Sequence, residues 1–233
     1  MNCISTCASR GLGKAIAEKF AAGGYHLYCC SRNLAALQET VKDLTTRYPG
    51  ITIKAQAFDL GVKEQAQEFG RWILDQGISI DILVNNAGQF IPGSVYNEAD
   101  GALEKMMEVN LYSAYHLTRA VLPAMMSQKK GHIFNICSIA SLQAYPNGGA
   151  YSISKFALAG FSKNLREEMK PHGVKVTALY AGATFTDSWA GSGIDPRRIM
   201  EAADIAEMVY TASRLSPQAT VEDILLRPQL GDL

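Results

Sequence analysis

The feature that most constrains this chain is a regular alternation of short β-rich runs with longer amphipathic runs. Strands are expected at residues 2–6, 25–30, 51–58, 80–84, 132–137, 174–180 and 221–226, and helices at 12–22, 34–48, 63–76, 99–126, 150–169 and 202–215. Parallel strands need crossover connections, and right-handed crossovers place helices on both faces of a sheet. The pattern therefore predicts an α/β fold, a Rossmann-like doubly wound parallel sheet of about seven strands flanked by helices on both faces.

Length and composition fit one such domain. The chain has 233 residues, 48% of them hydrophobic, and can bury one sizeable core. No repeat, low-complexity tract or linker interrupts it, so we expect a single NADP-binding domain over residues 1–233. Residues 187–196 contain two glycines and a proline and are expected to be the most mobile segment. Because ligands of doubly wound sheets bind beyond the carboxyl ends of the strands, polar residues that follow strands are the functional candidates.

The charge balance argues against nucleic acid and membranes as partners. Lys and Arg total 22, as do Asp and Glu, so no large field of one sign exists. No run reaches the roughly 18 apolar residues of a membrane span, and no basic-then-apolar leader opens the chain, so we expect a cytoplasmic protein. The five cysteines lack metal-ligand spacing; we expect reduced thiols and no metal site.

The stretch STCASRGLG at residues 5–13 follows the first expected strand and opens the first expected helix. Gly11 and Gly13 would let a pyrophosphate approach the free N–H groups and the positive dipole end of that helix. Glycines also end strands in ordinary turns, and a Gly-x-Gly alone does not separate these two interpretations.

Two arginines favour a phosphorylated dinucleotide. Arg32 follows the second expected strand, where no Asp or Glu is present to bind a ribose 2′-hydroxyl, and Arg10 lies in the first loop. The arginine fork matches phosphate geometry, so the pair indicates NADP(H) rather than NAD(H); the alternative is two solvated surface arginines. Asp59 closes the third expected strand and would either contact the adenine or cap the next helix.

The segment AYSISKF opens the helix expected at residues 150–169 and places Tyr151 and Lys155 four residues apart, on one helix face. An ammonium beside a phenol favours the phenolate, so we expect Lys155 to lower the pKa of Tyr151 from about 10. Ser138 follows the fifth expected strand and would hydrogen-bond a substrate carbonyl oxygen at the same sheet edge. The alternative is a core tyrosine with a surface lysine. The hypothesis of a catalytic Tyr151–Lys155 pair therefore depends on its combination with the glycine loop and Ser138.

These pieces resemble the short-chain dehydrogenase/reductase family over essentially the whole chain, in the segments TCASRGLG, DILVNNAG, EVN, NICS followed by YSISK, and AGATFT. The resemblance implies hydride transfer between NADP(H) and a carbonyl or alcohol. It implies that Tyr151 is the general acid and that Ser138 orients the substrate oxygen. Lys155 would bind the nicotinamide ribose, and Asn110 would support a water-linked proton path. The implied cofactor-binding residues are Thr6, Ser9, Arg10, Gly11, Leu12, Gly13, Arg32, Asp59, Leu60, Asn86, Ala87, Gly88, Tyr151, Lys155, Gly182, Thr184 and Thr186.

For some of these residues a structural role stays open. Asn85 and Asn86 would stabilise a turn, and Asn110 would bond a neighbouring helix carbonyl. Ser141 offers a second hydroxyl near Ser138.

Two positions depart from the family pattern, because Cys7 replaces its first glycine and Ala181 replaces the proline before Gly182. A left-handed backbone at residue 7 would cost a non-glycine about 1–2 kcal/mol, and crowding of the ribose would weaken cofactor affinity. We therefore expect cofactor binding, weaker than in relatives. Ala181 should loosen the loop after it. The departures also keep open an alternative function, a non-catalytic NADP-binding sensor or scaffold.

The expected substrate is a small free carbonyl or alcohol compound. A net charge of zero offers no basic dock for an acidic carrier protein. The end of the chain resembles sepiapterin-reductase-like members, while the rest would also suit a 3-oxoacyl-acyl-carrier-protein reductase. Phe90, Tyr145 and Trp189 are the aromatic residues expected near the substrate, under a small lid. The resemblance also implies a homodimer or homotetramer, built through the helices around Asn110 and Tyr151 and the last strand.

Overall fold

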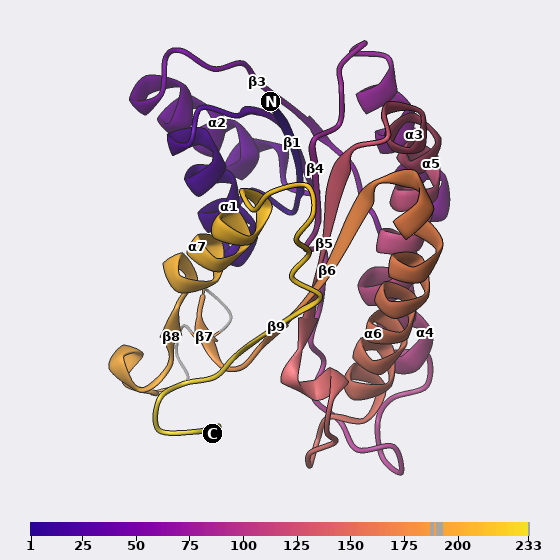
Figure 1. Ribbon diagram of the computed structural model, residues 1–233. Coiled ribbons are helices and arrows are strands. Elements are labelled where there is room, and N and C mark those ends of the chain that lie inside the picture. Colours follow the sequence, from indigo (N-terminus) through magenta and orange to yellow (C-terminus); the bar gives the residue numbers. More distant parts are fainter. Residues whose placement is uncertain (187–188, 190–192, 233) are drawn as a thin grey trace.

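The centre of the molecule is a seven-stranded parallel sheet, seen in a computed structural model that describes residues 1–186, 189 and 193–232 (Figure 1). Its strands are β1 (Asn2–Thr6), β2 (His26–Ser31), β3 (Ile53–Ala57), β4 (Ile82–Asn85), β5 (Gly131–Ser138), β6 (Val174–Ala181) and β9 (Asp223–Leu226). The strand order is β3-β2-β1-β4-β5-β6-β9, and every neighbouring pair is parallel. The order reverses between β1 and β4, so the ligand crevice of this sheet lies beyond the carboxyl ends of those strands.

Helices cover both faces of the sheet. One layer contains α1 (Gly11–Ala22), α2 (Leu34–Arg47) and α7 (Ala202–Ser213), and the other contains α3 (Lys63–Leu74), α4 (Ala102–Met107), α5 (Ser113–Gln128) and α6 (Gly149–Met169) (Figure 1). Successive strand residues serve opposite layers, since Cys3 packs with the first and Ile4 with the second. The predicted fold is therefore confirmed.

The helix expected over residues 99–126 is not one continuous α-helix. α4 ends at Met107, a π-helical turn spans Glu108–Tyr112, and α5 continues to Gln128. A π turn holds more residues than an α turn, and a 3.6-residue hydrophobic pattern gives no sign of it. Asn110 lies in this turn and is fully buried.

A second small sheet forms where the sequence predicts only a loop. β7 (Thr184–Phe185) pairs in parallel with β8 (Met200–Glu201), and short 3₁₀ helices span Ile139–Ser141, Lys170–His172 and Pro196–Arg198. Strands of two residues are too short to show alternation, so the sequence does not reveal them. Of the segment expected to be most mobile, residues 187–188 and 190–192 lie outside the described residues.

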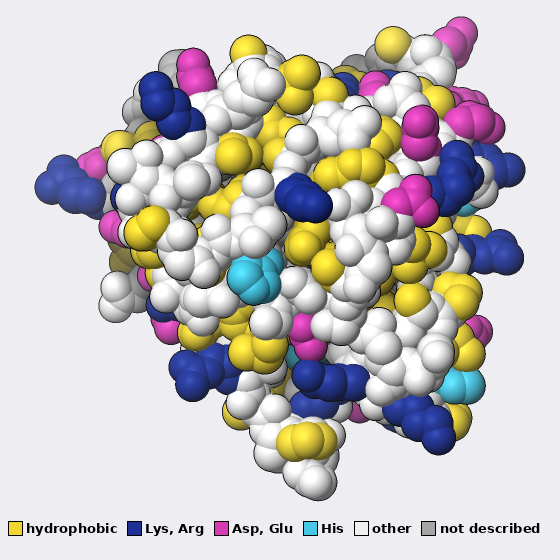
Figure 2. All heavy atoms as spheres, turned by 90° about the horizontal axis from the view of Figure 1, so that it is seen from above, with side chains coloured by type: hydrophobic (Ala, Val, Ile, Leu, Met, Phe, Trp, Pro, Cys, Tyr) yellow, Lys and Arg dark blue, Asp and Glu magenta, His cyan; other side chains and the backbone are white. Residues whose placement is uncertain are grey.

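Charges of both signs are mixed on the face shown in Figure 2. This face is the upper end of the molecule in Figure 1, where the chain begins, and hydrophobic side chains lie between the basic and acidic ones. Within the described ranges, no helix combines the length and the apolar character that a membrane crossing requires.

Candidate functional site

The loop after β1 has the backbone shape of an anion-binding turn. Gly11, the first residue of α1, has a φ of +54°. A Cβ at Gly13 would lie 2.3 Å from the Cys7 backbone oxygen and 2.6 Å from Asn86 Nδ2, so only glycine fits there. The side chain of Arg10, at the N-cap of α1, makes no capping hydrogen bond. The N–H groups of the first turn therefore keep their hydrogen-bonding capacity.

Cys7 has a φ of 55°, in the left-handed region, so the missing glycine does carry the backbone cost considered from the sequence. Burial raises the pKa of its thiol to about 11; Arg32 and Arg10 act to lower this pKa, and Asp59 acts to raise it. The charged residues predicted to bind the adenosine half of a cofactor therefore gather around residue 7.

Arg10 and Arg32 are both exposed to solvent, after β1 and β2 respectively. Neither forms a salt bridge with any residue that the structure describes. The two loops are joined by the hydroxyls of Ser9 and Ser31, whose oxygens are 2.8 Å apart. Two guanidinium groups near one sheet edge, neither of them salt-bridged to a described carboxylate, suit a phosphate ligand.

Asp59 shapes the turn after β3. Its Oδ1 accepts a hydrogen bond from Gly61 N at 3.0 Å, which is an Asx turn. The N-cap of α3 is Val62, so the alternative in which Asp59 caps that helix is wrong. Leu60 is buried in the core beside Phe58, which leaves only its backbone for the predicted cofactor contact.

Thr6 joins β1 to the segment after β4. Its hydroxyl donates to Val84 O at 3.2 Å and accepts from Asn86 N and Ala87 N at 2.8 and 3.0 Å. Asn86 Nδ2 donates to Thr6 O at 3.1 Å. The hydrogen-bonding capacity of the Thr6 hydroxyl is used in these contacts, so Thr6 shapes the crevice and does not offer its side chain to a ligand.

α6 brings Tyr151 and Lys155 together, as predicted. Lys155 Nζ lies 5.8 Å from the centroid of the Tyr151 ring. Lys155 is only 4% exposed, so the alternative of a surface lysine is wrong. The start of the helix is fixed by Glu98, whose Oε2 accepts from Ala150 N at 3.0 Å. The pair is therefore set at one end of a helix whose first turn is held by a neighbouring loop.

Lys155 reaches the end of β5. Its Nζ donates to the backbone oxygen of Ile136 at 2.9 Å, and burial lowers the pKa of the ammonium. A Cβ at Gly88 would lie 3.5 Å from Lys155 Nζ and 3.5 Å from Asn110 Oδ1. Gly88, the last residue of the NNAG segment, therefore lies against Lys155 and Asn110, two of the four predicted catalytic residues.

The expected lowering of the Tyr151 pKa is wrong. Burial raises the pKa of this phenol, a hydrogen bond with Ser138 lowers it, and the Cys137 thiol raises it. Burial outweighs the hydrogen bond because a phenolate in this position loses its hydration. Tyr151 is therefore protonated at neutral pH. Ser138 and Ser141 also cap the turn after β5 together, because Ser141 Oγ accepts from Ser138 N and Ser138 Oγ accepts from Ala140 N, both at 3.2 Å.

Asn110 links the segment after β4 to α6. Its Oδ1 accepts from Gln89 N at 2.7 Å, and its Nδ2 donates to Gln89 O at 3.0 Å and to Ser154 Oγ at 2.8 Å. Ser154 Oγ in turn donates to Tyr151 O at 2.7 Å. The alternative in which Asn110 bonds only a helix carbonyl is therefore wrong.

The predicted nicotinamide end lies after β6. Gly182 N donates to Leu226 O at 2.8 Å, so the pairing of β6 with β9 continues one residue past Ala181. Thr184 Oγ1 donates to Gly182 O at 3.0 Å. A Cβ at Gly11 would lie 3.4 Å from Thr186 Cγ2, which brings the segment after β6 to the glycine loop.

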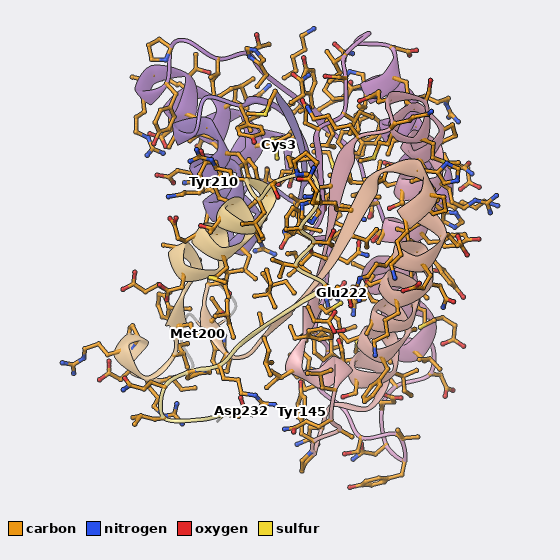
Figure 3. All side chains as sticks on the ribbon, in the orientation of Figure 1. Cys3, Tyr145, Met200, Tyr210, Glu222 and Asp232 are labelled. Carbon is orange, nitrogen blue, oxygen red and sulfur yellow. The ribbon has the colours of Figure 1, made fainter. Side chains whose placement is uncertain are left out.

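Two of the three predicted aromatic residues lie beside Tyr151. The Phe90 ring packs edge-on against it, with centroids 5.0 Å apart. Burial and Tyr151 together raise the pKa of Tyr145 to about 12. Figure 3 shows Tyr145 at the lower end of the molecule, on the side of α6, with Met200 of β8 on the other side. Trp189 is half-buried, and its backbone N–H donates to Thr186 O at 2.9 Å.

Comparison with known proteins decides the family. A family model described as short chain dehydrogenase matches residues 2–195. The chain belongs to this family. An uncharacterized oxidoreductase of Staphylococcus epidermidis is 29% identical over 225 residues, 97% of this chain and 96% of that protein.

Two solved structures are similar to this protein along nearly the whole chain. An alcohol dehydrogenase from the archaeon Thermococcus sibiricus, complexed with 5-hydroxy-NADP, has a TM-score of 0.89 at 27% identity and covers 97% of this chain and 96% of its own. A metagenomic short-chain oxidoreductase in complex with NADP has a TM-score of 0.85 at 30% identity and covers 98% and 97%. The structural homologues of this short-chain dehydrogenase thus include NADP complexes.

The crevice of this short-chain dehydrogenase fits such a dinucleotide. Glycine at residue 13 lets the start of α1 pack closely against Cys7 O and Asn86, and the N–H groups at the start of that helix suit an anionic ligand. Arg10 and Arg32 are exposed and follow β1 and β2, and the buried Lys155 lies next to Gly88, in the segment after β4. The residues that are present therefore match an elongated anionic cofactor.

The sequence did not reveal the residues that hold this site in place. Gln89 and Ile136 act through backbone atoms, which no side-chain pattern marks. Ser154 lies three residues after Tyr151, within YSISK, and that spacing was the only available signal. Asn85 is not a turn residue, since its Nδ2 donates to Thr118 Oγ1 and Asn135 Oδ1 inside the core.

Proposed function

We propose that this protein is an NADPH-dependent oxidoreductase that reduces the carbonyl group of a small free molecule to an alcohol. The observation that carries the proposal is the geometry around Tyr151, whose ring centroid lies 5.8 Å from Lys155 Nζ and whose hydroxyl is hydrogen-bonded to Ser138. A phenol carries its proton at neutral pH and can donate it to a carbonyl oxygen. The proposed direction is therefore reduction.

Each residue has a proposed task. Ser138 and Tyr151 bind the carbonyl oxygen through their hydroxyls, and Tyr151 donates its proton to that oxygen as the alkoxide develops. Lys155 binds the ribose hydroxyls and keeps a positive charge beside the phenol. Asn110 positions α6 through Ser154 and holds residue 89. NADPH, when bound, supplies the hydride.

The preference for NADPH over NADH is proposed from the two arginines. Arg10 and Arg32 would form a clamp for a 2′-phosphate, and Asp59 is a neighbour of the same loop. The remaining contacts to the cofactor would come from the N–H groups of the first turn of α1 and from Thr186, which lies against Gly11.

The test is the loss of NADPH absorbance with a panel of ketones, diketones, pteridines and oxoacyl thioesters. We expect turnover of at least one small free compound, and we expect Tyr151→Phe to lower kcat at least about a hundredfold, the size of a general-acid contribution. Tyr96→Phe is the matched control, because Tyr96 is 88% exposed. Full activity in Tyr151→Phe would refute the assigned proton donor.

A non-catalytic NADP-binding sensor or scaffold is the second candidate, favoured by the left-handed Cys7 in the cofactor loop. The same assay separates the two. Tight NADPH binding without turnover of any compound would support the sensor and refute the reductase.

We also propose that the protein forms homodimers or homotetramers. Leu103, Tyr112 and Tyr115 expose between 36% and 45% of their area on neighbouring turns of α4, the π turn and α5. β9 is the edge strand of the sheet and exposes 52% of Leu225. Exposed apolar surface of this kind suits a second copy of the chain. Light scattering after gel filtration tests this, and a monomer at micromolar concentration would refute it.

A further inference from the structure

The segment after β9 runs along the crevice end of the sheet. β9 ends at Leu226, and the residues that follow a parallel strand lie at the edge where ligands bind. In Figure 1 this segment passes below β7 and β8, and Figure 3 places its Asp232 at the lower end of the molecule, where Tyr145 also lies. A Cβ at Gly182 would lie 3.1 Å from Pro228 Cδ, so the segment starts against the predicted nicotinamide end.

Residues 227–232 form a strap whose far end is held by Arg198. Arg198 Nη1 donates to Gly231 O at 2.9 Å, and Nη2 donates to Asp232 O at 3.0 Å and to Leu230 O at 3.4 Å. A turn brings these three carbonyls together, because Gly231 N donates to Pro228 O at 2.9 Å and Gly231 has a φ of +84°. A guanidinium carries its N–H donors in a rigid fork, so one arginine binds several oxygens at once.

The anchor belongs to the small β7–β8 unit. Arg198 ends the 3₁₀ helix that directly precedes β8, and Met200 N donates to Ala183 O at 3.1 Å, just before β7. Thr186 follows β7, and a Cβ at Gly11 would lie 3.4 Å from Thr186 Cγ2. The strap is therefore connected through β7 and β8 to the glycine loop at the start of α1.

The β7–β8 unit needs such support. Each strand has two residues, and an isolated pair of strands is marginally stable in water. The strap contacts both ends of the unit, at Gly182 shortly before β7 and at Arg198 before β8. Arg227 and Asp232 form a salt bridge that joins the two ends of the strap to each other. The strap therefore restricts how far the unit can move from the crevice.

We propose that the strap holds the β7–β8 unit against the glycine loop, that Arg198 is its anchor, and that detachment of the strap sets the rate at which NADPH leaves. Arg198 is a positioning residue, because the contacts described for its guanidinium are with the strap. Opening of a segment beside the active site limits turnover in many enzymes. The part about NADPH release rests on the proposed function, and the attachment of the strap does not.

The first test measures hydrogen exchange by NMR in the chain without NADPH. We expect Arg198→Ala to speed exchange of the Met200 and Gly231 amides about tenfold, the equivalent of about 1.4 kcal/mol, and to leave the β5 amides unchanged. Leu230 and Gly231 are exposed, so water replaces the lost guanidinium and the variant should fold.

Arg197→Ala is the matched control for Arg198→Ala. Its side chain is 90% exposed and pairs with Asp195 in the same turn. The backbone N–H of residue 197 keeps its hydrogen bond to Asp195 Oδ1 in the variant. Exchange at Met200 and Gly231 should therefore match that of the unmodified chain.

The second test measures NADPH release by stopped-flow fluorescence, with excess NADP⁺ as the chase. We expect release about tenfold faster from Arg198→Ala than from Arg197→Ala or the unmodified chain, and an intermediate rate from Arg198→Lys, which keeps the charge and loses the fork.

Each contrary result has a separate meaning. Unchanged exchange in Arg198→Ala overturns the strap, and so does equally faster exchange in β5, which would show general destabilisation. Faster exchange at Met200 and Gly231 with unchanged NADPH release overturns the control of release. Failure of the unmodified chain to bind NADPH refutes the proposed function and the control of release together, while the exchange experiment still decides the attachment of the strap.

Discussion

The two sides of the crevice are held in place by different means. On the cofactor side, the loop after β1 depends on backbone shape, with positive φ at Cys7 and Gly11 and no space at Gly13. On the catalytic side, α6 and β5 depend on side-chain hydrogen bonds, from Lys155 to Ile136 O and from Asn110 to Gln89.

This difference predicts how each side fails. A substitution in the loop acts on the backbone and changes the path of the chain, so its effect follows the volume and the φ requirement of the new residue. A substitution on the catalytic side leaves the backbone where it is and exposes unpaired polar groups, so its effect follows the number of hydrogen bonds lost.

The largest expected effect is that of Gly13→Ala. The new Cβ would lie 2.3 Å from Cys7 O, so the loop must move, and we expect a loss of more than about 3 kcal/mol in the free energy of unfolding and no measurable NADPH binding. Urea denaturation and NADPH fluorescence measure these. Gly160→Ala is the control, because nothing lies within 4 Å of its Cβ position. Normal stability and NADPH affinity in Gly13→Ala would contradict the claim that backbone shape holds the loop after β1.

Asn110→Ala tests the catalytic side. It leaves Gln89 N, Gln89 O and Ser154 Oγ without their partner, and we expect a loss of about 2 kcal/mol of stability together with lower kcat. NADPH affinity should change less than it does in Gly13→Ala. Equal losses of NADPH affinity in Asn110→Ala and Gly13→Ala would show that the cofactor side and the catalytic side do not fail independently.

The Tyr151 pKa gives a pH test of the same side. Because burial raises the pKa of Tyr151, we expect its phenol to stay protonated, and the rate of carbonyl reduction to stay constant, between pH 6 and 9. The stability that the neutral phenol contributes is fully present below the unfolded pKa of about 10 and is lost as pH rises through the higher folded value.

Removing the Ser138 hydroxyl should raise the Tyr151 pKa further. The Ser138 hydroxyl lowers the Tyr151 pKa, so Ser138→Ala should raise it further. Ultraviolet difference titration against Tyr151→Phe isolates this one tyrosine. A Tyr151 pKa below 9 would show that the charge on Lys155 outweighs burial.

The smallest expected effect is that of Cys7→Gly. It relieves the left-handed strain, and we expect about 1 kcal/mol more stability and up to tenfold tighter NADPH binding. Thermal unfolding and fluorescence titration check these. Equal NADPH affinities of Cys7→Gly and the unmodified chain would show that the cysteine side chain does not weaken cofactor binding.

Much of the fold and the chemistry of the site could be predicted because they are local in sequence. The seven strands follow from short buried runs, and the pairing of Tyr151 with Lys155 follows from helical spacing. The helix from residue 99 was predicted as continuous because hydrophobic spacing does not record a π turn. β7 and β8 were missed because two residues carry no period.

The error on Tyr151 has a different cause. Helical spacing places a charge near the phenol, but the sign of a pKa shift depends on how much water both groups lose, and burial depends on the whole fold. The contacts of Asn110 to Gln89 are likewise set by elements that only the sheet brings together.

The π turn at Glu108–Tyr112 has a consequence for comparing this chain with others. The extra residue changes the rotational phase of everything from Ser113 to Gln128 relative to α4. An alignment or an engineered loop graft that removes one residue here would keep the length of the helix nearly constant. It would still rotate Tyr115 and Leu117 by about 100° around the helix axis. The exposed ring of Tyr115 would then turn toward the core, and the buried side chain of Leu117 would turn away from it.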